Sequence, residues 1–494
     1  MSETTTPTHR HAPDWLILTI ACVAQFMVVL DVSIVNVALP HMGADLHMNS
    51  VQVLWVVNAY VLTFAGFLLL GGRLADLFGR RKVYILGVVA FTLASIACGF
   101  AHTGPQIVIA RAIQGIGGAI LSPATLTIII TTFRGPRMPK AIGAWSAVAG
   151  AGGAVGVLAG GVLTGLASWR WVFFVNVPFG IVAAVAAVIY LQELRNQDAD
   201  SKLDVTGAIL ITGGLTAFIY AIVNTTTHPW GSSTTLSWLA VAAVGIVSFV
   251  FWEAKVASHP LVAFRIFRSR PLTVANIVML LAGGAFFSLW FFLTYYFQDT
   301  LGYGPVRAGF SFLPMAVAII IGAQISSRLL VKVGVRPLLL VGGLLATIGF
   351  YWLSLIGVHS SYVGNLLAPA FITSLAMGLL FAPLATAATA KVDRADAGLA
   401  SGVLNAARQI GGSLSLAVLG TIAADRTASL MRSAMGNQAL MAQAVVAGYT
   451  RGFQIAACIT GVATLVALAL PAKVGHHSSH AAAPSPEAAG AAGH

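Results

Sequence analysis

GGRLADLFGRRK, residues 71–82, separates two long apolar segments and combines three glycines, one aspartate and a terminal basic cluster. Gly72 and Gly79 permit tight turning and close approach of helices. Asp76 is placed to cap the following helix or to pair with a cation. A short basic loop between apolar segments is typical of the cytoplasmic side of a membrane protein.

The composition of the whole chain supports this interpretation. Of the 494 residues, 58% are hydrophobic and only 9% are charged, and the mean hydropathy is +0.88. Soluble domains usually contain about 25% charged residues. The cysteines Cys22, Cys98 and Cys458 stand alone in apolar runs, without metal-ligand spacing. We therefore expect an integral membrane protein with no disulfide framework, bound metal or cofactor.

Hydrophobic segments of about 20 residues, the length needed to cross about 30 Å of hydrocarbon as a helix, occur fourteen times along the chain. The segment 424–449 is polar enough to predict a short amphipathic surface helix instead of another span. The fourteen predicted spans are 15–38, 52–71, 83–101, 106–129, 141–165, 171–191, 205–225, 236–254, 273–297, 307–327, 337–357, 363–388, 398–422 and 451–471.

The basic residues fix the expected orientation. With both termini in the cytoplasm, 20 of the 27 lysines and arginines fall on the cytoplasmic side, five fall outside and two lie within spans. This asymmetry predicts a multi-pass protein of the plasma (inner) membrane with both ends cytoplasmic. It also accounts for the net charge of +12 without a nucleic-acid partner.

A faint internal repeat divides the predicted spans into two sets of six. A shift of 255 residues lays Gly334 on Gly79 and Gly411 on Gly156, which predicts two six-helix bundles and two inserted central helices. The predicted units are a cytoplasmic tail (1–14), an N-terminal bundle (15–191), a linker with two extra spans (192–272), a C-terminal bundle (273–471) and a disordered tail (472–494).

Several motifs resemble one transporter family. The 71–82 loop resembles the signature loop between helices 2 and 3 of the major facilitator superfamily. LDVSIVNVALP (30–40), RAIQGIGGA (111–119) and YFQDTLGYGPVRAGFSFLP (296–314) resemble motifs of its fourteen-helix drug:proton antiporter branch. The resemblance implies an all-α, polytopic membrane fold. It also implies a gating role for the loop residues Gly72, Asp76, Gly79, Arg80 and Arg81.

The fifth span departs from the antiporter pattern. Its glycine-rich run resembles the helix 5 motif, but Val157 follows Gly156 where the pattern has proline, so the helix lacks one determinant of a kink. The glycines form a small-residue ridge suited to close helix packing, which explains them as well as an antiporter function does. The ridge consists of Gly152, Gly156 and Gly160, and Gly161 lies next to it in the sequence.

Asp31 lies inside the first predicted span, where a charge costs roughly 2.5 to 3.5 kcal/mol on insertion scales. It lies nine residues, about 13 Å, before Pro40 near the outer end of the first helix, and Arg111 lies about 8 Å inside the outer start of the fourth span. Their similar depths predict a pair. We expect Asp31 to carry the coupling proton while Arg111 helps to set its proton affinity; the alternative is a static ion pair between the two helices.

Other polar and aromatic residues are candidates for substrate contact. Arg408 is near the middle of the thirteenth span, and it either faces a cavity or satisfies groups of its own half. The aromatic candidates could equally be interfacial belt residues. The full candidate set is Asn58, Tyr60, Gln114, Trp290, Tyr295, Arg408 and Gln409.

These features predict a proton-coupled exporter of amphiphilic drugs or antibiotics that acts as a monomer in the lipid bilayer. A proton-coupled importer of the same fold and a non-transporting membrane sensor remain alternatives. The chain has no GxxxxGK[ST] loop for ATP. It also has no HExxH or GxSxG motif, so we do not expect an enzyme.

Overall fold

The computed structural model describes residues 13–133, 137–193, 203–226, 228–390, 392, 396–434 and 437–471. Within these ranges the chain is helical and forms no β-strand. The long helices are α1 (Asp14–Asp45), α2 (Ser50–Phe78), α3 (Arg80–Gly99), α4 (Gly104–Thr132), α5 (Arg137–Leu166), α7 (Asn176–Tyr190), α8 (Val205–Val223), α9 (Ser233–Phe251), α10 (Arg270–Tyr295), α12 (Leu313–Val333), α13 (Val335–Leu353), α14 (Leu367–Thr389), α15 (Ala397–Ala434) and α16 (Gln438–Ala467). Short helices α6 (Trp171–Phe174) and α11 (Pro305–Ser311) precede α7 and α12.

Thirteen segments of the described chain are long and apolar enough to cross a membrane. Two of these segments combine a short α-helix with the long helix that follows it: α6 with α7 over Trp171–Tyr190, and α11 with α12 over Pro305–Val333. The described apolar part of α5, Ala151–Leu166, is shorter, although α5 itself has 30 residues. The protein is therefore a multi-pass membrane protein, and its helix count agrees with the predicted fourteen when α5 is included.

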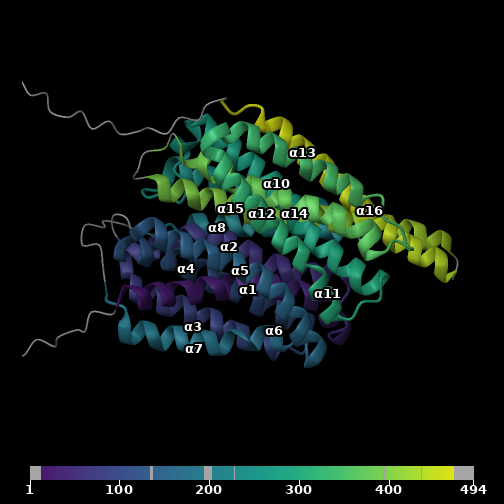
Figure 1. The fold of residues 1–494 in the computed structure, drawn as a ribbon, viewed down its shortest axis with the longest axis horizontal. Coiled ribbons are helices and arrows are strands. Elements are labelled where there is room, and N and C mark those ends of the chain that lie inside the picture. Colours follow the sequence, from purple (N-terminus) through teal and green to yellow (C-terminus); the bar gives the residue numbers. More distant parts are fainter. Residues whose placement is uncertain are drawn as a thin grey trace, which may run out of the picture.

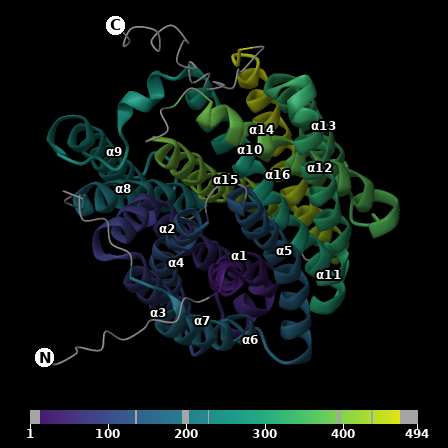
Figure 2. The ribbon, with the colours of Figure 1, turned by 60° about the vertical axis from the view of Figure 1, so that its left-hand side comes forward.

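The helices pack as two groups that lie side by side (Figure 1). One group contains α1 to α7 and the other α10 to α16, and the main contacts between them are α2 with α15 and α5 with α11. The inserted helices α8 and α9 pack against each other, and α8 contacts α2 and α15 (Figure 2). The start of α1 and the end of α16 lie at the same end of the bundle (Figure 1), as an even number of crossings requires.

Two glycines at corresponding positions support the internal repeat. Gly79 joins α2 to α3 at φ +94°, and Gly334 joins α12 to α13 at φ +82°. L-residues with a side chain rarely adopt such values. Gly156 and Gly411 also correspond, because Gly156 packs α5 on α1 and Gly411 packs α15 on α10.

Several predicted helix boundaries were wrong. The first helix continues through Pro40 to Asp45, beyond its predicted end at residue 38, whereas α4 and α14 continue through Pro123 and Pro383 as the predicted spans 106–129 and 363–388 do. The segment 424–449 is not a separate surface helix, because α15 and α16 extend through most of it. Hydropathy marks only the stretch that fits the hydrocarbon layer, and 38 residues of helix are about 57 Å long.

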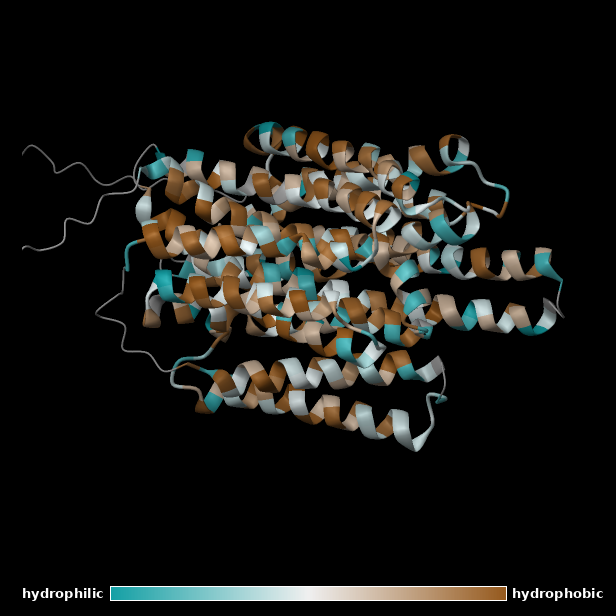
Figure 3. Ribbon diagram, turned by 90° about the horizontal axis from the view of Figure 1, so that it is seen from below, coloured by the Kyte–Doolittle hydropathy of each residue, from teal (hydrophilic) through white to brown (hydrophobic). Residues whose placement is uncertain are grey.

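Large apolar side chains occupy both the centre of each group and its periphery. Tyr84, Phe91 and Phe173 are fully buried in the first group, as Phe350 and Phe453 are in the second. Exposed leucines, isoleucines and valines cover the outer faces of the helices, and hydrophilic residues gather mainly near the helix ends (Figure 3). This distribution suits a lipid environment.

The glycine ridge of α5 packs against α1, the helix that carries Asp31. A Cβ at Gly152 would lie 3.2 Å from the Phe26 carbonyl oxygen, and one at Gly160 would lie 2.5 Å from that of Ile34. Since these neighbours are backbone atoms, a side chain at either position would force the helices apart. The ridge sets the distance between α1 and α5.

Replacing Gly160 with alanine is therefore expected to lower the stability of the folded protein by about 1 to 3 kcal/mol, as overpacking usually does. Thermal unfolding of the detergent-purified protein measures this effect. Gly143→Ala is the matched control in the same helix, because a Cβ there meets nothing within 4 Å. Equal melting temperatures for the two variants would contradict the close-packing role of the ridge.

Candidate functional site

Asp31 and Arg111 form an ion pair inside the N-terminal group. Arg111 Nη1 lies 2.5 Å from Asp31 Oδ2, and the two side chains are 2% and 0% exposed. Asp31 comes from α1 and Arg111 from α4, so the pair links two helices that lie far apart in sequence. The predicted partnership between these residues is present in the structure.

Two amides complete the surroundings of the carboxylate. Gln114 Nε2 donates to Asp31 Oδ1 at 2.7 Å, and Asn176 Nδ2 donates to the same oxygen at 3.0 Å. Asp31 thus accepts three hydrogen bonds from side chains of α4 and α7. These bonds and the ion pair occupy both oxygens of the carboxylate.

Arg111 is held as firmly as its partner. Its Nε donates to the Val56 carbonyl oxygen at 3.1 Å, and Nη1 also donates to Gln114 Oε1 at 2.8 Å. The guanidinium carbon lies 4.2 Å from the centroid of the Tyr60 ring, in cation–π geometry. Helix α2 therefore contributes a carbonyl and an aromatic face to the site.

Asn176 and Ser95 belong to this network, but sequence reasoning missed them. Asn176 Nδ2 also donates to Ser95 Oγ at 3.1 Å, and Ser95 donates to the Phe173 carbonyl oxygen at 2.9 Å. Asn176 was visible as a lone amide in the apolar segment 171–190. Its depth alone could not show that its side chain points towards α1.

The network balances one negative and one positive charge inside the helical bundle. A proton added to Asp31 would cancel the carboxylate charge and leave the Arg111 charge without its partner. Such an uncompensated charge is costly in a low-dielectric interior. The arrangement can therefore couple protonation of Asp31 to a change in the packing of α1, α4 and α7.

The candidate substrate residues of the N-terminal group occupy two different environments. Tyr60 and Gln114 are fully buried and contact Arg111, so both belong to the ion-pair network. Asn58 Oδ1 instead accepts a hydrogen bond of 2.7 Å from Ser413 Oγ in α15. Asn58 thus bridges the two groups of helices near the centre of their interface.

The aromatic candidates lie in one helix of the C-terminal group. Trp290 is partly exposed and stacks on Phe312, with 5.1 Å between ring centroids. Tyr295 is also partly exposed and lies 4.9 Å from Phe291 by the same measure. The two rings therefore pack against different aromatic neighbours, Trp290 against the junction of α11 and α12 and Tyr295 against its own helix.

The polar candidates of α15 differ in their accessibility. Arg408 is partly exposed and bonds to Asn405, whereas Gln409 is buried. The structure gives them different surroundings, because consecutive residues of a helix point in different directions.

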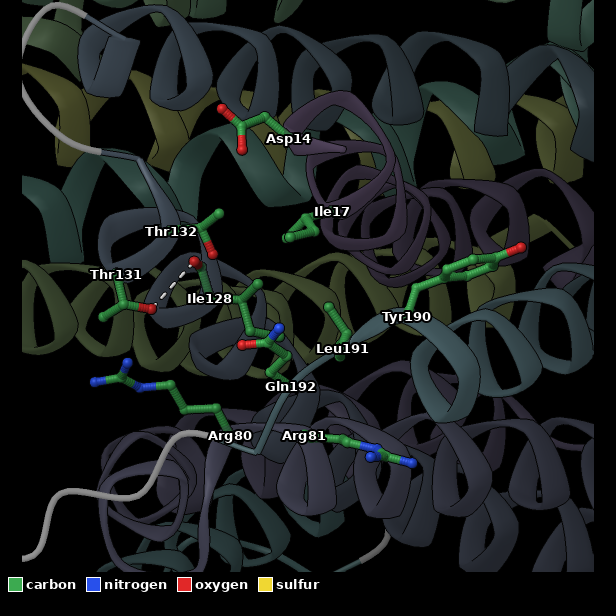
Figure 4. A pocket seen from close by; sticks show the side chains of 10 residues that line it. All are labelled: Asp14, Ile17, Arg80, Arg81, Ile128, Thr131, Thr132, Tyr190, Leu191 and Gln192. Carbon is green, nitrogen blue, oxygen red and sulfur yellow. Dashed lines mark hydrogen bonds between the residues drawn. The ribbon is translucent and has the colours of Figure 1, made fainter. Parts of the chain in front are cut away.

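The loop between α2 and α3 lies beside a cavity of about 250 Å³ at the end predicted to face the cytoplasm. Arg80 and Arg81 line it from α3, and Asp14 lines it from α1 (Figure 4). The two arginine side chains point in opposite directions, and Arg81 Nη2 donates to the Val188 carbonyl oxygen at 2.5 Å. The predicted gating side chain of Asp76 lies outside the described residues.

Gly72 lies at an ordinary helix contact that a side chain could also make, whereas Gly161 lies at a close one. A Cβ at Gly72 would meet the Pro123 side chain at 3.7 Å, between α2 and α4. Gly161 faces the other group of helices, and a Cβ at Gly309 would lie 3.2 Å from its Cα. On the same side of the molecule, Gln298 Nε2 donates to the Val37 carbonyl oxygen at 2.9 Å.

Comparisons with known proteins agree with the fold. The family model described as Major Facilitator Superfamily matches residues 21–416. The chain is 41% identical to the cephamycin export protein of Amycolatopsis lactamdurans, over 83% of this chain and 85% of that protein. It is 37% identical to the puromycin resistance protein of Streptomyces alboniger, over 88% and 87% of the two chains.

Solved structures share the fold at lower sequence identity. A D-xylose–proton symporter has a TM-score of 0.64 at 14% identity, and the match covers 94% of this chain and 99% of that one. An inward-facing, occupied bacterial homologue of the human lysosomal transporter Spinster has a TM-score of 0.63 at 16% identity, with 92% and 95% coverage.

Breaking the buried ion pair is expected to destabilise the protein by about 3 to 5 kcal/mol, because one charge remains buried without its partner. Asp31→Asn and Arg111→Gln should each lower the melting temperature, and the double variant should lose less than the sum of the two. Asp14→Asn is the control, since the exposed Asp14–Arg137 pair contributes roughly 0 to 1 kcal/mol. Additive losses in the double variant would show that the two charges do not depend on each other.

Proposed function

Because this chain belongs to the major facilitator superfamily, we propose that it exports small amphiphilic compounds across a bacterial plasma membrane in exchange for protons. Two relatives in the comparisons are named as an export protein and a resistance protein, and both align over more than four fifths of this chain. The buried Asp31–Arg111 pair carries the proton part of the proposal.

The proton step centres on Asp31. It takes up a proton from the outside, the bond to Arg111 weakens, and the helices around the pair repack so that the proton leaves to the cytoplasm. Both side chains are shielded in this conformation, so each transfer needs a rearrangement that opens a path. One proton moving down 100 mV supplies about 2.3 kcal/mol, which is enough to bias alternating access.

The two groups of helices are the moving units of this cycle, and we assign them to residues 15–191 and 273–471. In transporters built from two such repeats the substrate site lies between the halves. Asn58, Trp290, Tyr295 and Arg408 are our candidates for substrate contact. The loop residues Asp76, Arg80 and Arg81 close the cytoplasmic side in one state and release it in the other.

The distribution of basic residues supports an orientation with both termini in the cytoplasm. The loop that carries Arg80 and Arg81 lies at the same end as the start of α1 (Figure 4), as this orientation requires. We propose that the protein acts as a monomer.

An importer that couples solute uptake to proton entry is the second candidate. The observation in its favour is Val157, which replaces the proline of the antiporter pattern and leaves α5 as one helix from Arg137 to Leu166. A continuous α5 still forms the close contacts with α1 and α11. We therefore retain the exporter as the better-supported function.

The direction of transport separates these candidates. The purified protein is reconstituted into vesicles with its cytoplasmic side facing the medium. When the lumen is more acidic than the medium, an exporter is expected to accumulate a fluorescent amphiphile, such as ethidium, in the lumen. An importer would instead release the dye from preloaded vesicles under the same gradient. A membrane sensor would show no flux that depends on the gradient.

Replacing Asp31 with asparagine is expected to abolish gradient-driven transport, with a loss of at least tenfold in initial rate. Substrate exchange without a proton gradient should persist, because that step does not need the titrating carboxylate. The rates are compared for equal amounts of protein that elute as a single folded species. Full gradient-driven transport by Asp31→Asn would leave the ion pair with a static, structural role only.

A further inference from the structure

Arg408 places a second guanidinium deep inside the C-terminal half. It is the twelfth residue of α15, which begins at Ala397, so it lies about 16 Å along that helix. This depth is beyond the headgroup region, where arginine side chains ordinarily reach lipid phosphates. Its side chain lies among α10, α14 and α15 and keeps part of its surface accessible.

Most of the hydrogen-bonding capacity of Arg408 is unused. A guanidinium has five N–H donors. In the described part of the chain one bond is formed, from Nη2 to Asn405 Oδ1 at 2.9 Å. The Phe381 ring centroid lies 5.9 Å from the guanidinium carbon, and none of the four ion pairs among the described residues includes Arg408.

The sequence supplies no acidic residue at a matching depth. Of the 15 acidic residues, Asp31 alone lies near the middle of a span, and Arg111 already neutralises it. The acidic residue within α15 is Asp425. It lies seventeen residues, about 25 Å, farther along the helix than Arg408. The chain therefore contains two guanidiniums inside its spans and one carboxylate to match them.

Gly283 lets α10 pack closely against the stem of Arg408. A Cβ at Gly283 in α10 would lie 3.1 Å from Arg408 Cγ, so a side chain there would crowd the arginine stem. Phe381 from α14 offers an apolar surface beside the charge. A cation with free donors next to an aromatic ring suits a ligand that has an acidic group attached to an apolar body.

We propose that Arg408 binds the carboxylate of the transported compound, so that the substrates include anionic amphiphiles. This inference rests on the proposed export function and adds a charge class to it. An unpaired cation at this depth is costly. An anionic substrate supplies the missing counter-charge while it is bound.

The test uses one fluorescent amphiphile in two charge states, 11-(dansylamino)undecanoic acid and its methyl ester. The purified wild-type protein is expected to bind the acid at least tenfold more tightly than the ester. Arg408→Gln should remove this preference without weakening the ester, and Arg408→Lys should retain part of it. Arg451→Gln is the control, since Arg451 is exposed and bonds only Gln454 among the described residues.

Melting temperatures separate a binding role from a structural one. Arg408→Gln without ligand should melt no lower than the wild type, because no ion pair is lost, and the acid should stabilise the wild type only. A large drop in melting temperature with equal loss of both probes would overturn the proposal. The proposal would also be overturned if the acid bound the wild type no more tightly than the ester. It would likewise be overturned if the preference for the acid disappeared when chloride replaced gluconate in the buffer.

Transport of the ester distinguishes this inference from the export function. If everted vesicles accumulate the ester under a proton gradient but show no Arg408-dependent preference for the acid, export stands and the anion site is wrong. If the acid binds with Arg408-dependent affinity and neither probe is transported, the anion site stands and export is wrong.

Discussion

The buried bond between Asp31 and Arg111 is the constraint on which the N-terminal half depends. Burying either charge alone inside a helical membrane bundle would cost free energy. The pair also needs hydrogen-bond partners for the oxygens and N–H groups that the ion pair does not use. Gln114, Asn176 and a carbonyl of α2 supply these. Four helices are thereby fixed around one charge pair, and a proton is the smallest change that can disturb it.

The two halves share a packing scheme but differ in charge. Gly156 and Gly411 place corresponding helices in contact, and Gly79 and Gly334 make the same turn. The N-terminal half holds a closed pair of opposite charges, whereas the described C-terminal half holds a cation with free donors. This division would let one half respond to protons while the other recognises the compound that is moved.

Much of this arrangement could be predicted from the sequence, because membrane spans are long and strongly apolar. The pairing of Asp31 with Arg111 followed from depth and charge alone. Asn176 could not be found in that way, since depth does not fix the direction in which a helical side chain points. The outer parts of α15 and α16 were missed because they lie beyond the apolar stretch, where hydropathy no longer distinguishes a continuing helix from a surface one.

Helix α5 joins the Asp31–Arg111 pair to the interface between the halves. Gly152, Gly156 and Gly160 contact α1 before and after Asp31, and the two backbones are too close to leave room for a side chain. One residue later, Gly161 contacts α11 of the other half. A shift of α11 would therefore act on α5, which packs mainly against α1 on its other side. Because close-packed backbones are not freely compressible, movement at the interface and repacking around Asp31 are physically linked.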